Sequence, residues 1–262
     1  MGVSITAYGN FNVVRGCHVI DSVYGGINIT GHSDNNIISD CIIEGSGEHG
    51  LVNKDSNHTQ ISGGIYSDNI KIAIARGIYA YRSTHLSIQG VHASGNSEHG
   101  ILLSTDCSYC IIRGNIVLDN GVAGGAHTQD GIVVASNCEY NLIAENIVAN
   151  SPRSEIRVHS SDCNYNTIIN NLVYGTHDVA ILNAATSTVI ERNRGYLTEN
   201  RGRSTGTAAQ QTIAHGLAAA PTQVILWNIE DAAIPYQSAV ADATNIYITA
   251  ASGKDYGWEA RV

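Results

Sequence analysis

The sequence predicts an all-β protein in which most of the chain forms a parallel β-helix of about seven to eight stacked coils, followed by a small antiparallel β-module. Three observations predict this class. Glycine is frequent, at 27 of 262 residues, and only 14% of residues are charged, which is too apolar for disorder and too rich in turns for a helical protein. One short motif recurs at intervals that suit a solenoid. The C-terminal segment instead alternates apolar and polar residues, as half-buried strands do.

The recurring motif joins cysteine, tyrosine and asparagine to a short apolar run. It is written DCSYCIIRGNIVLDN, NCEYNLIAENIVAN and DCNYNTIINNLVYG, and more weakly TSTVIERNRGYLTEN. Its second asparagine recurs after 31, 25 and 22 residues, at Asn115, Asn146, Asn171 and Asn193. Upstream, Cys17 and Cys41 keep a similar register, 24 residues apart.

A second element keeps step with this motif, as GGINIT, HGLVNK, RGIYAY, HGILLS, DGIVVA, SEIRVH and VAILNA. Each repeat therefore supplies at least two short strands separated by Gly, Asn, Asp and Ser, with no helical stretch between them. This pattern excludes a βαβ array and leaves stacked coils, in which equivalent residues lie about 4.8 Å apart. We expect the repeated asparagines to form an inward ladder that sets a turn, rather than a reactive site.

Stacked coils with an inward asparagine at a turn resemble the right-handed parallel β-helix of the pectate-lyase and polygalacturonase superfamily, over about residues 8 to 200. The resemblance implies a right-handed coil, and since many functions share this scaffold it predicts fold more than activity. Within this class the chain resembles a phage tail-spike polysaccharide depolymerase. We therefore assign residues 1–200 to the β-helix and residues 201–262 to a linker and a C-terminal β-module.

The C-terminal segment begins with RGRSTGTAAQQ, which we interpret as the linker. The module after it resembles the C-terminal modules of phage tail proteins, through an HGL turn before Pro221 and a closing Trp258-Glu259-Ala260 strand. That resemblance implies a homotrimer, in which the module caps the coil end and buries aromatic surface against other chains. The alternative is that its aromatic residues form its own core.

Charge and composition limit the partners and the compartment. The net charge is −9, without a cluster of Lys and Arg, so we expect no binding to nucleic acid. No apolar run reaches the length of a membrane span, and the N-terminus lacks the pattern of a signal peptide. We expect the chain to fold without a signal peptide in the producing cell and, from the resemblance, to work on a virion tail or extracellularly.

The six cysteines suit the interior of the coils better than a metal site. Cys107, Cys138 and Cys163 occupy equivalent positions in successive repeats, and the CxxC that ends at Cys110 has no second half. We expect buried thiols, with neither a metal nor a cofactor.

Candidate chemistry lies in the column of residues that precede the glycines of the second element. These are His49, Arg76, His99 and Asp130, followed by either Ser154 or Glu155 in the next coil. Solvent-facing columns usually contain Thr, Ser and Asn, so this set is unusual. Arg157 and His159 lie beside it, and a Gly-rich insertion, NGVAGGAHTQDG, would bring His127 to its edge.

Three interpretations of this column compete with a fourth, in which it is only a solvated ladder of charges. In a polysaccharide-cleaving site, Asp130 and Glu155 would divide the acid and the base or nucleophile duties, and His99 would help to position the sugar for them. His49, Arg76, His127, Arg157 and His159 would then bind the glycan. In a lyase or epimerase, His99 or Arg76 would abstract the proton beside a uronate carboxylate. In the third interpretation, the column binds a glycan or a protein without catalysis.

Overall fold

The computed structural model describes residues 2–122, 129–228, 238–250, 252–253 and 255–262. The chain divides into two compact units, Met1–Gly195 and Tyr196–Val262, and each is described by itself.

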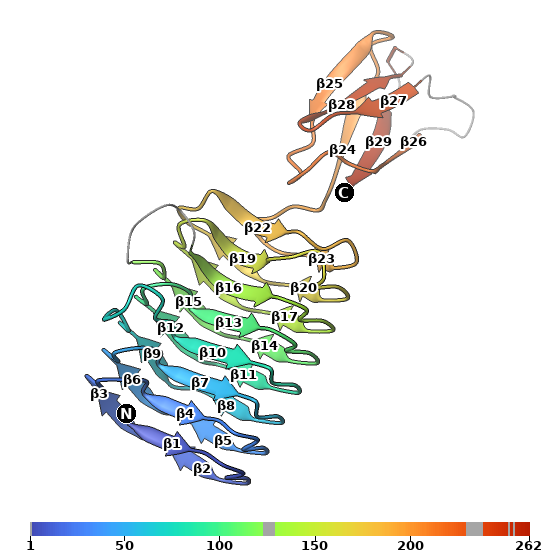
Figure 1. Cartoon of the computed structure of the whole chain (residues 1–262). Helices are drawn as coiled ribbons and strands as arrows, with labels where there is room; N and C mark the ends of the chain where they lie inside the picture. Colours follow the sequence, from blue (N-terminus) through green and yellow to red (C-terminus); the bar gives the residue numbers. More distant parts are fainter. Residues whose placement is uncertain (1, 123–128, 229–237, 251, 254) are drawn as a thin grey trace. The chain divides into compact units, whose positions relative to one another are not determined.

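The first unit is the predicted parallel β-helix, with eight coils and three faces (Figure 1). Sheet A contains β1 (Val3–Ile5), β4 (Ile27–Ile29), β7 (Leu51–Lys54), β10 (Ile78–Tyr81), β13 (Ile101–Ser104), β16 (Asp130–Ala135), β19 (Ser154–Val158) and β22 (Val179–Asn183). Sheet B contains β2 (Val13–Arg15), β5 (Ile37–Ser39), β8 (Gln60–Ser62), β11 (Ser87–Gln89), β14 (Ile111–Arg113), β17 (Leu142–Ala144), β20 (Thr167–Ile169) and β23 (Val189–Glu191). Sheet C contains β3 (His18–Ile20), β6 (Ile42–Glu44), β9 (Ile65–Ser67), β12 (His92–Ser94), β15 (Ile116–Leu118), β18 (Ile147–Ala149) and β21 (Leu172–Tyr174).

Stacked apolar side chains fill the interior of the coils. On sheet A one inward row runs through seven coils, each residue at most 2% exposed: Ile27, Leu51, Ile78, Ile101, Ile132, Ile156 and Ile181. The parallel pairing places these residues directly over one another, so each coil buries its apolar face against the next. Register is strongly specified, because a slip of one residue would turn this row outward.

Asparagine ladders hold the corners, as predicted. Between sheets B and C, the Asn115 backbone N–H donates to Oδ1 of Asn146 at 3.0 Å, and the same bond joins Asn146 to Asn171 and Asn171 to Asn193. A similar ladder, made by Asn69, Asn96 and Asn120, lies between sheets C and A. The motif of the repeat is therefore a device for turning the chain.

The cysteines lie mostly inside, as expected. Five of the six thiols are buried and Cys17 is half-buried. The backbone N–H of Cys107 donates to Sγ of Cys138 in the next coil at 3.2 Å. These thiols fill the same interior space as the apolar rows.

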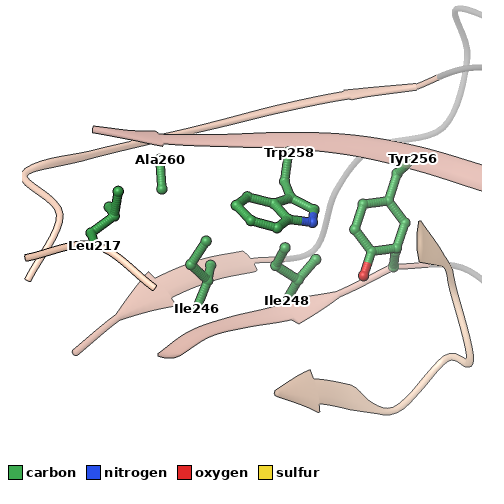
Figure 2. Close-up of a cluster of buried hydrophobic side chains, with 7 residues drawn as sticks. Leu217, Ile246, Ile248, Tyr256, Trp258 and Ala260 are labelled. Carbon is green, nitrogen blue, oxygen red and sulfur yellow. The ribbon is translucent and has the colours of Figure 1, made fainter. Parts of the chain in front are cut away.

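The second unit contains two antiparallel three-stranded sheets. The β29 sheet pairs β24 (Glu199–Thr205) and β26 (Gln223–Asn228) with β29 (Asp255–Arg261). The β28 sheet pairs β25 (Gln210–Ala214) and β27 (Ser238–Ala241) with β28 (Asn245–Thr249). Figure 2 shows the buried cluster between them, which includes Leu217, Ile246, Ile248, Tyr256, Trp258 and Ala260.

The expected linker was wrong, because residues 199–205 form β24 and residues 210–214 form β25. The inward positions of β24 are small or polar, so the segment lacks the apolar alternation of a strand. Gly202 lies against the indole of Trp258, where a Cβ would approach Cε2 to 2.8 Å. A bulky side chain from β29 thus fills the space that β24 leaves empty.

The aromatic residues of this unit divide between core and surface. Trp258 and Tyr256 are buried in the unit's own core, as the alternative interpretation proposed, whereas Trp227 is 38% exposed. Tyr236 lies outside the described residues. In the part of the chain that the structure describes, no helix has the length and apolarity needed to cross a membrane.

Candidate functional site

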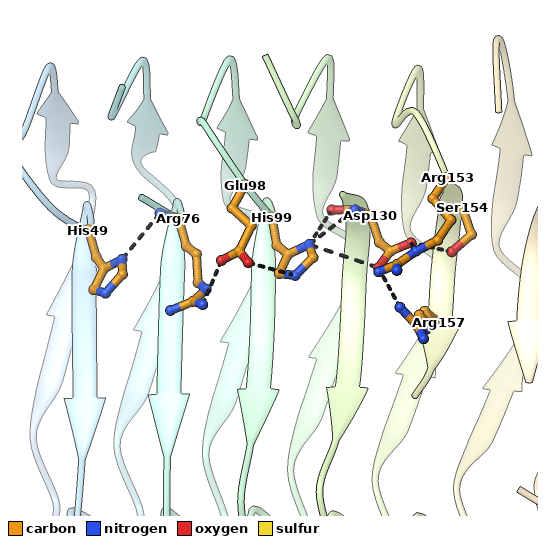
Figure 3. A network of polar contacts seen from close by, with 8 residues as sticks. All are labelled: His49, Arg76, Glu98, His99, Asp130, Arg153, Ser154 and Arg157. Atoms are coloured by element: carbon orange, nitrogen blue, oxygen red, sulfur yellow. Dashed lines mark hydrogen bonds and ion pairs between the residues drawn. The ribbon is translucent and has the colours of Figure 1, made fainter. Parts of the chain in front are cut away.

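The predicted column lies where the chain enters the strands of sheet A. His49, Arg76 and His99 lie two residues before β7, β10 and β13, and Asp130 is the first residue of β16. Figure 3 shows their side chains along successive coils. Asp130 pairs in the sheet with Ser154, so the column continues to Ser154 and not to Glu155.

Glu155 points into the coil, which corrects the expectation that it faces Asp130. It takes the place of the glycines that follow the column in earlier coils, such as Gly131, where a Cβ would lie 2.4 Å from Cγ1 of Val148 inside the coil. Its carboxylate is fully buried, accepts the backbone N–H of Ser151 and lies 3.0 Å from Nδ1 of His177. Burial raises the pKa of Glu155, against the lowering effect of these two partners. Glu155 thus lies inside the coil whereas Asp130 lies in the outward column, so the two carboxylates do not face each other.

Asp130 is fully buried and bonded on both oxygens. Arg153 binds it with two nitrogens, Nε donating to Oδ1 at 2.8 Å and Nη2 to Oδ2. Ser154 Oγ donates to Oδ1 at 2.6 Å, and Nη1 of Arg157 lies 3.8 Å from Oδ2. A carboxylate held in this way anchors neighbouring side chains. Arg153 was missed by the sequence analysis, since it precedes the strand and reaches back one coil.

The two histidines of the column each cap a backbone group of the next coil. Nδ1 of His49 accepts the N–H of Arg76 at 3.2 Å, and Nδ1 of His99 accepts the N–H of Asp130 at 3.0 Å. Burial lowers the pKa of both imidazoles to about 4, so they are neutral at pH 7. The Nδ1 lone pair is occupied, which leaves Nε2 as the N–H that faces solvent or a neighbour.

The opposite tautomer of His99 would donate from Nδ1 to the carbonyl of Asp130 at 3.3 Å. It would set two N–H groups against each other at 3.0 Å, so the structure favours Nδ1 as the acceptor. Nε2–H of His99 then faces Oε1 of Glu98 at 3.7 Å. The Nδ1 lone pair of His99 already accepts the N–H of Asp130, so it is not available as a base. His99 is instead placed to orient the carboxylate of Glu98.

Glu98 carries the most exposed carboxylate of the site, with its side chain 22% exposed, although its Oε2 is buried. Its Oε2 lies 2.5 Å from Nη2 of Arg76, whose guanidinium covers the ring of Tyr79 at 4.6 Å. Burial raises the pKa of Glu98, and Arg76 opposes that rise. Glu98 was not among the predicted site residues, because it lies one residue before the column that contains His99.

Arg157 carries an unsatisfied guanidinium. Its side chain is 15% exposed, and its Nε and Nη1 are buried without a hydrogen-bond partner among the described residues. Burial lowers the pKa of Arg157, and the nearby Arg153 lowers it further. The guanidinium thus has one ion contact, with Asp130, and two donors without a hydrogen bond, so an anion at its exposed edge would bind favourably.

We call Arg76, Glu98, His99, Asp130, Arg153 and Arg157 the sheet A cluster. With a neutral imidazole, its three guanidiniums and two carboxylates leave one excess positive charge. The chain as a whole carries −9. The cluster is therefore a local exception, which an anionic ligand would complement.

An apolar floor adjoins the cluster on the outward face of sheet A. Leu102, Val133 and Ala135 are buried there, with Tyr79 packed against them. Sheet register places Tyr79, Leu102, Val133 and Arg157 in one row over four successive coils. The row is about 14 Å long, at about 4.8 Å per coil.

The remaining predicted residues lie at the edge or outside the described chain. His159 is exposed just after β19, and burial together with Arg157 lowers its pKa. His127 lies outside the described residues. Among the described residues, no group of three or more His, Cys, Asp and Glu side chains is arranged to hold a metal ion.

Comparison with known proteins places this geometry in context. The family model for the right-handed β-helix region matches residues 2–152, and no curated protein matches the chain. The periplasmic alginate epimerase AlgG is 18% identical with a TM-score of 0.62, covering 72% of this chain and 45% of the epimerase.

Two further structures are similar. The alginate lyase from Paenibacillus sp. str. FPU-7 is 14% identical with a TM-score of 0.52, covering 73% of this chain and 75% of the lyase. Tailspike protein 2 from Escherichia coli O157:H7 bacteriophage CAB120 is 19% identical with a TM-score of 0.53, covering 68% of this chain and 28% of the tailspike. The chain spans less than half of the epimerase and of the tailspike. At these identities the similarity shows the fold.

Proposed function

The chain belongs to the right-handed β-helix family, and from this premise we propose that it acts on an anionic polysaccharide lying along the outward face of sheet A. The observation that carries the proposal is the buried guanidinium of Arg157, with Nε and Nη1 lacking hydrogen-bond partners among the described residues. A planar, delocalised cation with spare hydrogen-bond donors attracts a carboxylate. Uronic acids present a carboxylate on every sugar residue, and the similar structures include an alginate epimerase and an alginate lyase.

The apolar row supports a polymer rather than a single sugar. It extends from Arg157 over Val133 and Leu102 to Tyr79, about 14 Å away. That length accommodates about three sugar residues along the axis of the β-helix. The partly exposed ring of Tyr79 suits the carbon-bound hydrogens of a pyranose, while the charged cluster beside the row receives its carboxylates.

The chemistry that this cluster favours is proton transfer at the carbon beside a uronate carboxylate. Glu98 is partly exposed, has a raised pKa and lies beside the Nε2–H of His99, so it is suited to accept and return a proton. Arg157 would stabilise the charge that develops on the substrate carboxylate. Asp130 is enclosed by its own ion pairs, which disfavours hydrolysis by a pair of carboxylates.

The test uses the whole chain with mannuronan, polygalacturonate and neutral dextran. Binding, absorbance of unsaturated ends, reducing ends and the NMR spectrum of the product are followed together. We expect binding to an acidic polymer and either unsaturated ends or an altered ratio of uronate epimers. Binding only to dextran, or reducing ends alone as product, would overturn the proposal.

Two variants connect the activity to the site. Arg157→Gln should weaken binding of the acidic polymer by about tenfold or more, the usual scale for a hydrogen bond to a charged group. Arg113→Gln is the matched control, since Arg113 pairs with Glu145 at the surface of sheet B. Glu98→Gln should keep binding and lower turnover by about a hundredfold. Equal loss from Arg157→Gln and Arg113→Gln would show that the attraction is only general charge.

We also propose that the protein works as a homotrimer on a virion tail or extracellularly. The similarity of fold to a phage tailspike and the C-terminal HGL and Trp-Glu-Ala motifs support this assignment. A polymeric substrate on a cell surface suits a site that is open along the side of a β-helix.

A further inference from the structure

A second surface of interest lies in the C-terminal unit, on the outer face of the β29 sheet. Alternate residues of its strands point away from the core, and the register sets them in rows across the sheet. Arg203, Gly257 and Trp227 form one row, and Arg201, Glu259 and Ile225 form the next. The face therefore combines one large aromatic ring with several charged groups.

Trp227 is held in place by a glycine. Gly257 lies between Trp227 and Arg203, and a Cβ there would lie 2.1 Å from Cε2 of the indole. The indole thus packs on the backbone of Gly257, yet 38% of Trp227 stays exposed. Glycine in the middle of a strand weakens it and often marks a close approach of another group. Here it fixes a rigid aromatic surface on the outside of the unit.

Polar groups with free hydrogen-bonding capacity surround this ring. The side chains of Arg203 and Arg201 are exposed and form no hydrogen bond or ion pair with a described residue. Asp255 accepts a 2.5 Å bond from Oγ1 of Thr205 on one oxygen. A depression of about 190 Å³ is lined by Arg203, Ser204, Thr205 and Asp255, and one of about 370 Å³ by Glu199, Asn200, Arg201, Glu259 and Arg261.

We propose that this face is a second glycan-binding surface, separate from sheet A, on which a sugar ring packs against Trp227 while its hydroxyl groups donate to Asp255 and its hydroxyl or acidic groups accept from Arg203. Arg203 and Trp227 lie two strand spacings apart, about 10 Å between their Cα atoms, and the indole covers Gly257 between them, so a sugar on the outer face of the indole lies within reach of the Arg203 side chain. The lone ring among charged neighbours fits an amphipathic sugar better than an apolar protein surface, whose contact core is depleted of charge. The surface anchors a glycan and needs no catalytic group.

The test measures retention of the full chain on immobilised polysaccharides, using mannuronan, polygalacturonate, dextran and purified bacterial lipopolysaccharide. Four proteins are compared: the parent, Trp227→Ala, Arg203→Gln and the control Val240→Ala, which removes another exposed apolar side chain from the same unit. Each is made also with Arg157→Gln, so that binding at sheet A is weakened. Circular dichroism confirms the fold and light scattering gives the mass.

We expect a glycan that the Arg157→Gln protein still binds, with affinity about tenfold lower after Trp227→Ala, lower after Arg203→Gln and unchanged after Val240→Ala. Absence of any such glycan would overturn the second surface while leaving the site on sheet A untouched. A change of mass in Trp227→Ala, with glycan binding kept, would identify the face as a contact between copies of the chain and would also overturn the proposal.

Discussion

Replacing Asn146 by alanine tests the corner that sets the register of the β-helix. Asn146 is 1% exposed and makes four hydrogen bonds through its side chain. Its Oδ1 accepts the backbone N–H of Asn115 at 3.0 Å, and its Nδ2 donates to the carbonyl of Ile112 at 2.9 Å. Alanine would leave both of these buried main-chain groups without a partner.

The magnitude follows from those two groups. An unpaired buried polar group costs about 1 to 3 kcal/mol, so Asn146→Ala should lower the free energy of unfolding by about 2 to 6 kcal/mol. The β-helix unit spans Met1–Gly195. A unit of that size has an unfolding entropy of about 0.4 kcal/mol/K, so the expected fall in Tm is about 5 to 15 °C.

Circular dichroism during a thermal ramp measures this fall on the full chain, read from the transition of the β-helix. Gln60→Ala is the control, because Gln60 is an exposed amide on β8 and its loss should leave the Tm nearly unchanged. If Asn146→Ala melts with the parent protein, the ladder does not stabilise the corner. The hydrogen-bond argument would then be refuted.

Three further predictions concern pH, the site and assembly. Below pH 6.5 the unfolded chain protonates His49 and His99 whereas the folded imidazoles, with pKa about 4, stay neutral. Each histidine therefore lowers the free energy of unfolding by about 3 kcal/mol as the pH falls from 6.5 to about 4. His99→Gln removes one of these contributions and should flatten the dependence of Tm on pH. Asp130→Asn should cost about 3 to 5 kcal/mol by leaving Arg153 poorly paired, against at most about 1 for Asp40→Asn, whose carboxylate pairs with Arg15 at the surface. Equal Tm values for these two variants would contradict the role of Asp130 as an anchor. Light scattering should give three times the chain mass of 27.8 kDa, and a mass of one chain would contradict the trimer.

The fold of the β-helix could be predicted because its defining residues are local and repeated. Each coil needs an inward asparagine at a corner. Asn115 and Asn146 occupy the same position of the repeated motif, so the sequence itself predicts this corner. The strand β24 could not be predicted in the same way. Its inward positions are Asn200, Gly202 and Ser204, and what makes them a strand is the distant Trp258, which occupies the space over Gly202. Tertiary packing outweighed local preference there.

The site was found only in part, because the column is visible in sequence while the direction of each side chain is not. At the corner before sheet A two successive residues point inward, so strict alternation misplaced Glu155 by one position. Arg153 lies in the turn, where no spacing rule connects it to Asp130 one coil earlier. The sequence predicted that His49 and His99 belong to the column. Their role as acceptors for backbone N–H groups depends on the orientation of each ring, which cannot be predicted from the sequence.

The same geometry explains how a solenoid can acquire a charged site without losing its fold. Inward rows fix the register, since Ile132 and Ile156 stack whatever their outward neighbours are. Arg157 stands in the outward row, where the two preceding coils have Leu102 and Val133. Its guanidinium is therefore partly withdrawn from water beside an apolar floor, whereas an exposed arginine would remain well hydrated. A cation in that position attracts an anion more strongly than one at the surface does, because the effective dielectric constant is lower. One substitution in an outward row can thus create an anion-binding position, and the neighbouring coils supply the surface on which the rest of a polymer lies.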